Sequence, residues 1–342
     1  MKPKKESTHH VSRKKFLGVF GSVIAGGSIV GVSGALLRKN SSAQKNTIQQ
    51  QGLMVQQPKE TAYPYKLVSS FSVPDKIDCF EICDDKLIAA TPNNIYVYDR
   101  SGLLLNNFSA DSDIRDIAVE NNRIYVLYPT RIAAYSMEGE WIDEWEACSP
   151  KSDYCQFAVT PDFVFVTDAA NKNICKYTAD GNFVSFIQSP HGFVIPSYTF
   201  GIVHIDGSIY CSNPGRHQVE RYSLNGDHIA TFGKPGAVAG RFCGCCNPVH
   251  LSFTSNGDVI TSEKGNPRIS CYGPDGQFRS VLLDSKSLGG GNTAYDIKVK
   301  GDEIYTAGKN LISTFRYDKV LAAATSCSSC KANCPLREGT LI

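Results

Sequence analysis

The feature that most constrains the fold is an internal repeat that runs through most of the chain. In each copy, a run ending in an aromatic residue leads into a turn with glycine, and a second run with an aromatic or large apolar residue follows. The turn glycines are spaced 37, 42, 45 and 50 residues apart. A regular period of this length indicates a repeat architecture. The five glycines are Gly102, Gly139, Gly181, Gly226 and Gly276.

Each copy is preceded by two further runs with the alternation of a β-strand, and none of these runs has a helical period. Four short strands per unit and six units predict an all-β fold, a six-bladed β-propeller of four-stranded blades. The sixth copy, Thr314–Lys319, stops at its turn. The run Lys66–Val73 has the pattern of the missing strand, so we expect an N-terminal strand to close the ring. A β-sandwich with accidental periodicity is the alternative.

Two segments resemble the NHL-repeat family of six-bladed propellers. Gly240–Gly276 has a Gly-x-Phe start, a proline, apolar alternation, a Gly turn, a Gly-Asn-x-Arg-Ile stretch and an Asp-Gly turn. Val166–Gly181 matches the second half of that pattern. The resemblance covers roughly residues 66–320. It implies the propeller fold and leaves the function open, because members of the family bind proteins, RNA or small molecules, or catalyse reactions.

The N-terminus predicts export. A basic start precedes the uncharged run Phe16–Leu37, which is long enough to span a bilayer. Ser12–Gly18 resembles the twin-arginine (Tat) export signal, with Lys14 in place of the second arginine. We expect the protein to work outside the cytoplasmic membrane, in the periplasm or at the cell surface, held by an N-terminal anchor. The predicted parts are a signal or anchor (1–38), a flexible tether (39–62), the propeller (63–320) and a Cys-rich tail (321–342).

The distribution of charge argues against a nucleic-acid partner. Of the 35 basic and 33 acidic residues, the first 39 positions hold eight basic residues and one acidic residue. The rest of the chain is therefore mildly acidic, which is the opposite of a nucleic-acid-binding surface.

Two cysteine clusters suggest a cofactor. The tail reads Cys-x2-Cys-x3-Cys-Pro and resembles a bacterial ferredoxin motif that lacks its first cysteine, where Ala324 stands. A second cluster lies in one loop, and together the clusters could supply a four-thiolate iron–sulfur site, with zinc as the alternative metal. Disulfides between loop and tail are the other alternative, since adjacent cysteines are not expected to pair with each other. The clusters are Cys243, Cys245 and Cys246 in the loop, and Cys327, Cys330 and Cys334 in the tail.

The other cysteines favour simpler roles. Those at strand positions are expected to be small core residues, whereas Cys148 and Cys155 flank a short loop and could form a disulfide. The strand cysteines are Cys79, Cys83, Cys175, Cys211 and Cys271.

A ring of polar residues is expected at the central channel. When the repeats are aligned, Cys79, Asp116, Gln156, His250 and Asp296 each begin the first strand of a repeat. Such a ring could bind a cation or a polar ligand, or simply line a solvated channel mouth. His250 follows the cysteine loop closely, so we expect it to act as a metal ligand or to carry a proton.

Three functions remain open at this point. The favoured one is a redox or electron-transfer subunit with a cysteine-ligated iron–sulfur site, docked to a membrane or periplasmic redox protein. The second is a non-enzymatic propeller that binds a protein or another ligand and has structural disulfides. The third is a lyase- or lactonase-like enzyme with a channel metal held by Asp116, Asp296 and His250. An electron-transfer or binding role is favoured over an enzyme.

Overall fold

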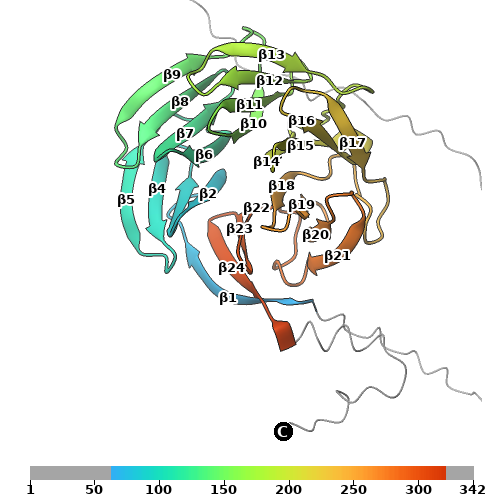
Figure 1. Cartoon of the computed structure of the whole chain (residues 1–342). Helices are drawn as coiled ribbons and strands as arrows, with labels where there is room; N and C mark the ends of the chain where they lie inside the picture. The colour runs from blue at the N-terminus through green and yellow to red at the C-terminus, as the bar shows by residue number, and fades with distance from the viewer. Residues whose placement is uncertain (1–62, 321–342) are drawn as a thin grey trace, which may run out of the picture. The chain divides into compact units, whose positions relative to one another are not determined.

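The structure, a computed structural model, describes residues 63–320 as six four-stranded antiparallel sheets that form a ring (Figure 1). The predicted propeller is therefore confirmed. The predicted signal, tether and tail lie outside the described residues. No helix between residues 63 and 320 is long and apolar enough to cross a membrane.

From β2 onward, the chain enters each blade at its inner strand and moves outward. Blades 1 to 3 contain β2 (Cys79–Cys83), β3 (Lys86–Ala90), β4 (Asn94–Asp99), β5 (Leu104–Ser109), β6 (Asp116–Glu120), β7 (Arg123–Tyr128), β8 (Arg131–Ser136), β9 (Trp141–Glu146), β10 (Tyr154–Val159), β11 (Phe163–Asp168), β12 (Asn173–Thr178) and β13 (Phe183–Ile187).

Blades 4 and 5 follow the same order, and blade 6 supplies only three of its own strands. They contain β14 (Ile202–Ile205), β15 (Ser208–Asn213), β16 (Gln218–Ser223), β17 (His228–Phe232), β18 (His250–Phe253), β19 (Val259–Glu263), β20 (Arg268–Tyr272), β21 (Phe278–Leu283), β22 (Asp296–Lys300), β23 (Glu303–Gly308) and β24 (Leu311–Tyr317), with the short 3-10 helix η1 (Pro214–Arg216) between β15 and β16.

The first strand of the chain closes the ring. β1 (Tyr65–Ser72) is the outermost strand of blade 6 and pairs antiparallel with β24, from Tyr65 opposite Tyr317 to Ser72 opposite Leu311. The predicted closure by the N-terminal strand is confirmed. The exposed edge that β24 would otherwise present is covered by this pairing.

The repeated glycines are explained by contacts between neighbouring blades. Gly139 has a φ of +94°, and a Cβ atom there would lie 2.4 Å from the ring of Phe108 on the outer strand of the preceding blade. Both the backbone conformation and the space therefore require glycine. Gly102 meets Phe71 of β1 in the same way, so the closing strand makes the contact that is also made at four other blade boundaries. The remaining pairs are Gly181 with Trp145, Gly226 with Ile187, and Gly276 with Phe232.

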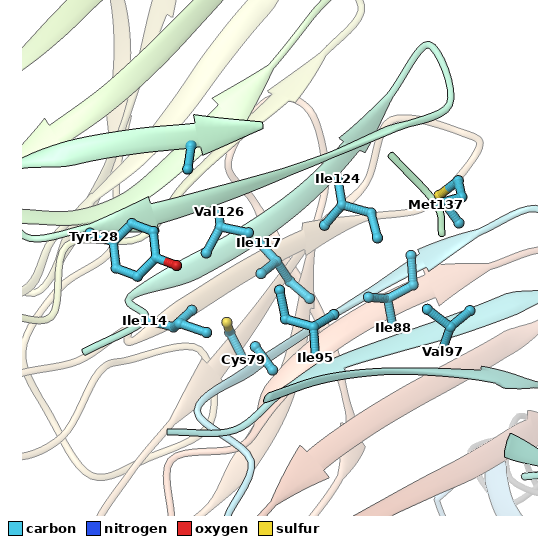
Figure 2. Close-up of a cluster of buried hydrophobic side chains, with 12 residues drawn as sticks. Cys79, Ile88, Ile95, Val97, Ile114, Ile117, Ile124, Val126, Tyr128 and Met137 are labelled. Atoms are coloured by element: carbon cyan, nitrogen blue, oxygen red, sulfur yellow. The ribbon is translucent and has the colours of Figure 1, made fainter. Parts of the chain in front are cut away.

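The hydrophobic core is divided among the boundaries between blades. Figure 2 shows the boundary between blades 1 and 2, where Ile88 and Ile95 of blade 1 pack against Ile117 and Ile124 of blade 2. The other five boundaries each have their own cluster of buried side chains. Four strand cysteines, Cys79, Cys175, Cys211 and Cys271, belong to such clusters, and Cys83 packs against one. Their predicted packing role is confirmed.

Candidate functional site

The predicted polar ring lies at the starts of the inner strands. Asp116, His250 and Asp296 are the first residues of β6, β18 and β22, Cys79 begins β2, and Gln156 is the third residue of β10. The sixth place belongs to Gly201, which directly precedes β14. A Cβ atom at Gly201 would lie 2.8 Å from the carbonyl oxygen of Val249 and 3.0 Å from Oε1 of Gln156. This position was not predicted, because a glycine beside a strand carries no chemical signal of its own.

The two ring aspartates tie neighbouring blades together. Asp116 accepts hydrogen bonds from the backbone N–H groups of Ile117 at 3.0 Å and Phe157 at 3.2 Å. Asp296 does the same with Ile297 at 2.7 Å and Phe80 at 3.1 Å. In both cases one partner belongs to the next blade around the ring. The carboxylates therefore serve the fold directly, because each satisfies backbone donors at a blade boundary.

Burial gives Asp116 an unusual protonation state. Its side chain is almost fully buried, and desolvation raises its pKa to about 8, with Lys298 lowering it and Asp296 raising it further. Desolvation disfavours the charged carboxylate in such a place. Asp116 is therefore largely protonated at neutral pH.

His250 is held through one ring nitrogen. The side-chain amide nitrogen of Gln156 lies 2.8 Å from Nδ1, and Oδ1 of Asp296 lies 3.7 Å from the same atom. Among the described residues, Nε2 has no hydrogen-bond partner. Burial lowers the pKa of His250, since the nearby charge of Asp296 offsets desolvation only in part. The imidazole is neutral at pH 7 and is oriented by a second side chain, as a proton acceptor needs to be.

The ring of polar residues lies between two cavities of the central channel. The mouth cavity, of about 760 Å³, lies on the side of the ring where the inner strands begin. The inner cavity, of about 330 Å³, continues along those strands. Both cavities are lined by Gln156, His250 and Asp296. The wall of the mouth cavity also includes Arg115, Tyr198, Phe200, Val249 and Lys309, a mixture of apolar and cationic groups that suits a small organic ligand.

A charged pair lies in the inner cavity. Nζ of Lys298 is 2.9 Å from Oε2 of Glu81, and both side chains are largely buried. Burial disfavours the ammonium, but the neighbouring acidic side chains, Glu81 first and then Asp296 and Asp116, raise the pKa of Lys298. The lysine stays charged and balances the acidic side chains of the channel. This pair was not predicted, since neither residue begins a strand.

The cysteine loop leads directly into the ring. It connects β17 to β18; Cys243 is half-buried, Cys245 is exposed and Cys246 is buried. The sulfur atoms of Cys245 and Cys246 are 2.9 Å apart. Both cysteines are free in the structure, so the expectation that these neighbours do not pair is not contradicted.

The part of the chain that the structure describes contains no complete metal site. Between residues 63 and 320, no group of three or more His, Cys, Asp or Glu side chains could hold a metal ion. Asp116, Asp296 and His250 therefore do not form the channel metal site considered above, and His250 is not grouped with the loop cysteines as a ligand. The tail cysteines Cys327, Cys330 and Cys334 lie outside the described residues, so an iron–sulfur or zinc site that joins them to Cys243, Cys245 and Cys246 stays a prediction.

A second pair of sulfur atoms differs from the expected one. Sγ of Cys148 lies 3.2 Å from Sγ of Cys175. Cys155 instead places its sulfur 3.7 Å from the backbone oxygen of Asp153. Cys148 therefore faces a cysteine of β12 and not Cys155, because the loop after β9 folds over the neighbouring blade.

Comparison with known proteins supports the fold alone. No family model matches the chain, so the NHL-repeat resemblance is not shown, and no curated protein matches it. A solved structure of a catalytically inactive histidine-to-alanine variant of virginiamycin B lyase from Staphylococcus aureus, with quinupristin, is 18% identical. It aligns with 71% of this chain and 82% of its own, with a TM-score of 0.52. A streptogramin B lyase structure is 14% identical, covers 74% of this chain and 97% of its own, and has a TM-score of 0.51. At these identities the likeness shows a shared six-bladed architecture.

Proposed function

We propose that this protein is an enzyme of the lyase class. In this proposal the mouth cavity binds a small organic substrate, and His250 removes a proton from a carbon atom next to a carbonyl group. The observation that carries the proposal is the state of His250, which is neutral, fixed through Nδ1 and open at Nε2 between two cavities.

The groups around His250 suit a general base. For Nε2 to accept a proton, Nδ1 must carry one, and the Asp296 carboxylate at 3.7 Å favours that tautomer. The amide of Gln156 can turn its oxygen toward Nδ1 and accept this hydrogen bond, because its two ends exchange by rotation about one bond. When Nε2 takes the substrate proton, Asp296 stabilises the imidazolium that forms. The electron pair left on the carbon then forms a double bond to the neighbouring carbon, whose bond to the leaving group breaks, and the leaving group departs with that bond's electrons.

The aligned proteins agree with this chemistry. Two of the solved structures with the same architecture are lyases, and one was made inactive by replacing a histidine with alanine. This similarity raises the expectation of a lyase and does not identify the substrate.

The test measures turnover with a matched control. The purified protein is incubated with quinupristin and a panel of simpler lactones and esters, and products are followed by mass spectrometry. We expect one or more compounds to be cleaved, with His250→Ala lowering the rate by about 100-fold or more. His204→Ala is the control, because His204 lines only the inner cavity. Equal rates in the wild type and His250→Ala would contradict the proposal, and binding without turnover would favour a binding protein.

A second candidate is the electron-transfer role. The observation in its favour is the concentration of sulfur in the loop, where Cys245 and Cys246 lie 2.9 Å apart. A cluster would need ligands from the tail, and a membrane or periplasmic redox protein would be its partner. Iron and acid-labile sulfide in equal amounts, lost on Cys330→Ser and Cys334→Ser, would support this role. Colourless protein without iron, purified anaerobically, would exclude it.

A further inference from the structure

The strongest unassigned feature is the pair of adjacent cysteines in the loop between β17 and β18. Their sulfur atoms are 2.9 Å apart, so the two thiols are in direct contact. Cys245 is exposed and Cys246 is buried. One sulfur is thus accessible to a reagent from solution, and the other is held directly behind it.

The loop is fixed from both sides. The side chain of Asn247 donates to the backbone oxygens of Cys243 at 2.7 Å and Lys264 at 3.0 Å, and accepts from the N–H of Lys264 at 2.9 Å. A ring nitrogen of His217 contacts the carbonyl oxygen of Gly244. These contacts hold the two residues in one place, so their proximity does not depend on a chance approach of mobile side chains.

We propose that Cys245 and Cys246 form a redox-active dithiol that reacts with small-molecule disulfides. The protein alternates between two thiols and a disulfide that joins the adjacent residues. An iron–sulfur ligand role and this role exclude each other for the same two sulfur atoms.

The reaction is balanced by the reduction of the attacking partner. The exposed sulfur of Cys245, as the thiolate, attacks one sulfur of the external disulfide, and the first small thiolate leaves. Cys246 then loses its proton and attacks the sulfur of Cys245, so that the second small thiolate leaves and the internal disulfide forms. Two protons and two electrons pass from the protein to the external disulfide, which becomes two thiols.

Covalent geometry makes this disulfide easy to reduce. Consecutive Cα atoms lie about 3.8 Å apart, whereas Cα atoms joined by an ordinary disulfide lie usually about 4.4–6.8 Å apart. A bridge between neighbours is therefore strained, and strained disulfides are the reducible ones. This favours a reversible role over a structural one.

The experiment measures how many cysteines of one tryptic peptide are free after oxidation. Trypsin cleavage after Arg241 and Lys264 releases a peptide that contains Cys243, Cys245 and Cys246 and no other cysteine. The full-length protein is reduced, freed of reductant, incubated with oxidised glutathione, quenched with acid and labelled with N-ethylmaleimide under denaturing conditions. We expect the wild-type peptide to carry one label, on Cys243, and to lack two hydrogen atoms. Treatment with dithiothreitol should restore three labelling sites.

Three variants give distinct outcomes. Cys243→Ser is the matched control and should still form the internal disulfide. Cys246→Ser should accumulate glutathione on Cys245, because the resolving thiol is absent, and Cys245→Ser should accumulate none on Cys246. Three labels on the oxidised wild-type peptide, or a disulfide that includes Cys243, would overturn the proposal. So would bound iron and sulfide that protect Cys245 and Cys246 from labelling. The wild-type measurement remains decisive if a variant does not fold.

Discussion

The side-chain amide of Gln156 lies 2.8 Å from Nδ1 of His250, although blade 4 stands between the two blades that carry these residues. The contact is possible because blade 4 presents Gly201 at the corresponding place. A Cβ atom there would come within 3.0 Å of Oε1 of Gln156. The absence of a side chain at one position thus allows a contact between two others.

Gly201→Ala should therefore disturb His250 without touching it. The added methyl group would meet the backbone oxygen of Val249 at 2.8 Å, so either Gln156 or the chain before β18 must move. We expect the free energy of unfolding to fall by about 1–3 kcal/mol, the usual cost of overpacking. The NMR signal of the His250 ring should also shift. An unchanged ring signal and unchanged stability would show that Gln156 does not depend on the gap at Gly201.

Asp116 should make stability depend on pH. Its pKa is about 8 in the folded protein and 3.8 when unperturbed, so the folded state holds a proton that the unfolded state has lost between these values. Its contribution to stability is fully present below the lower value and is lost as pH rises toward 8. Asp116→Asn should remove this dependence. The test compares unfolding free energies of both proteins from pH 5 to 9 in urea, and parallel curves would contradict the raised pKa.

His250 should give the opposite dependence of the free energy of unfolding on pH. Its pKa is lowered by burial, so the unfolded state binds a proton more readily than the folded state. Stability from this residue is therefore present above the unperturbed pKa of 6.5 and is lost as pH falls below it. His250→Gln should be less sensitive than the wild type between pH 7 and 5. Titration of the ring by NMR checks the direction, and a folded-state pKa above 6.5 would contradict it.

Cys148 and Cys175 should form a disulfide when the protein is oxidised. Their sulfur atoms are 3.2 Å apart, and closing this loop would stabilise the fold by about 3 kcal/mol. Peptide mapping should find the bridge in the wild type and in Cys155→Ser, the matched control. Reduction should lower the melting temperature of both proteins. It should change the melting temperature of Cys175→Ser only slightly, because that variant cannot form the bridge. A bridge between Cys148 and Cys155 would refute this pairing.

The closing strand β1 should stabilise the ring through the side chain of Phe71. Its half-buried ring covers Gly102 of the next blade. Phe71→Ala should lower the free energy of unfolding by about 2 kcal/mol, less than for a fully buried phenylalanine. Leu67→Ala is the control on the same strand. Leu67 is 57% exposed, so its substitution should change the free energy of unfolding little. Equal effects of the two substitutions in urea denaturation would mean that the contact with Gly102 does not stabilise the ring.

The fold could be predicted because each blade repeats the same local requirement. A glycine such as Gly139 is needed wherever the outer strand of the previous blade places a large ring over the turn, and the sequence records this at a regular period. The closing strand was predictable for the same reason, since Phe71 repeats the role of Phe108.

The site was predictable only in part. The positions of Asp116, His250 and Asp296 follow from the starts of strands, which the repeat alignment supplies. Contacts across the channel depend on distances that no alignment contains. The pair of Lys298 with Glu81 was missed for this reason. The pairing of Cys148 with Cys175 was missed because a loop folds over a neighbouring blade.

The pairing of β1 with β24 also determines when the protein can finish folding. During synthesis the strand that begins at Tyr65 emerges first, but its partner near Tyr317 is made only after every other blade. Until then the growing chain carries an unpaired strand at one end and an incomplete blade at the other. Bringing such distant segments together has a high entropic cost and slows folding. The ring therefore becomes a finished structure only once nearly the whole propeller has left the ribosome, and a chain shortened before β24 would lack a partner for its own first strand.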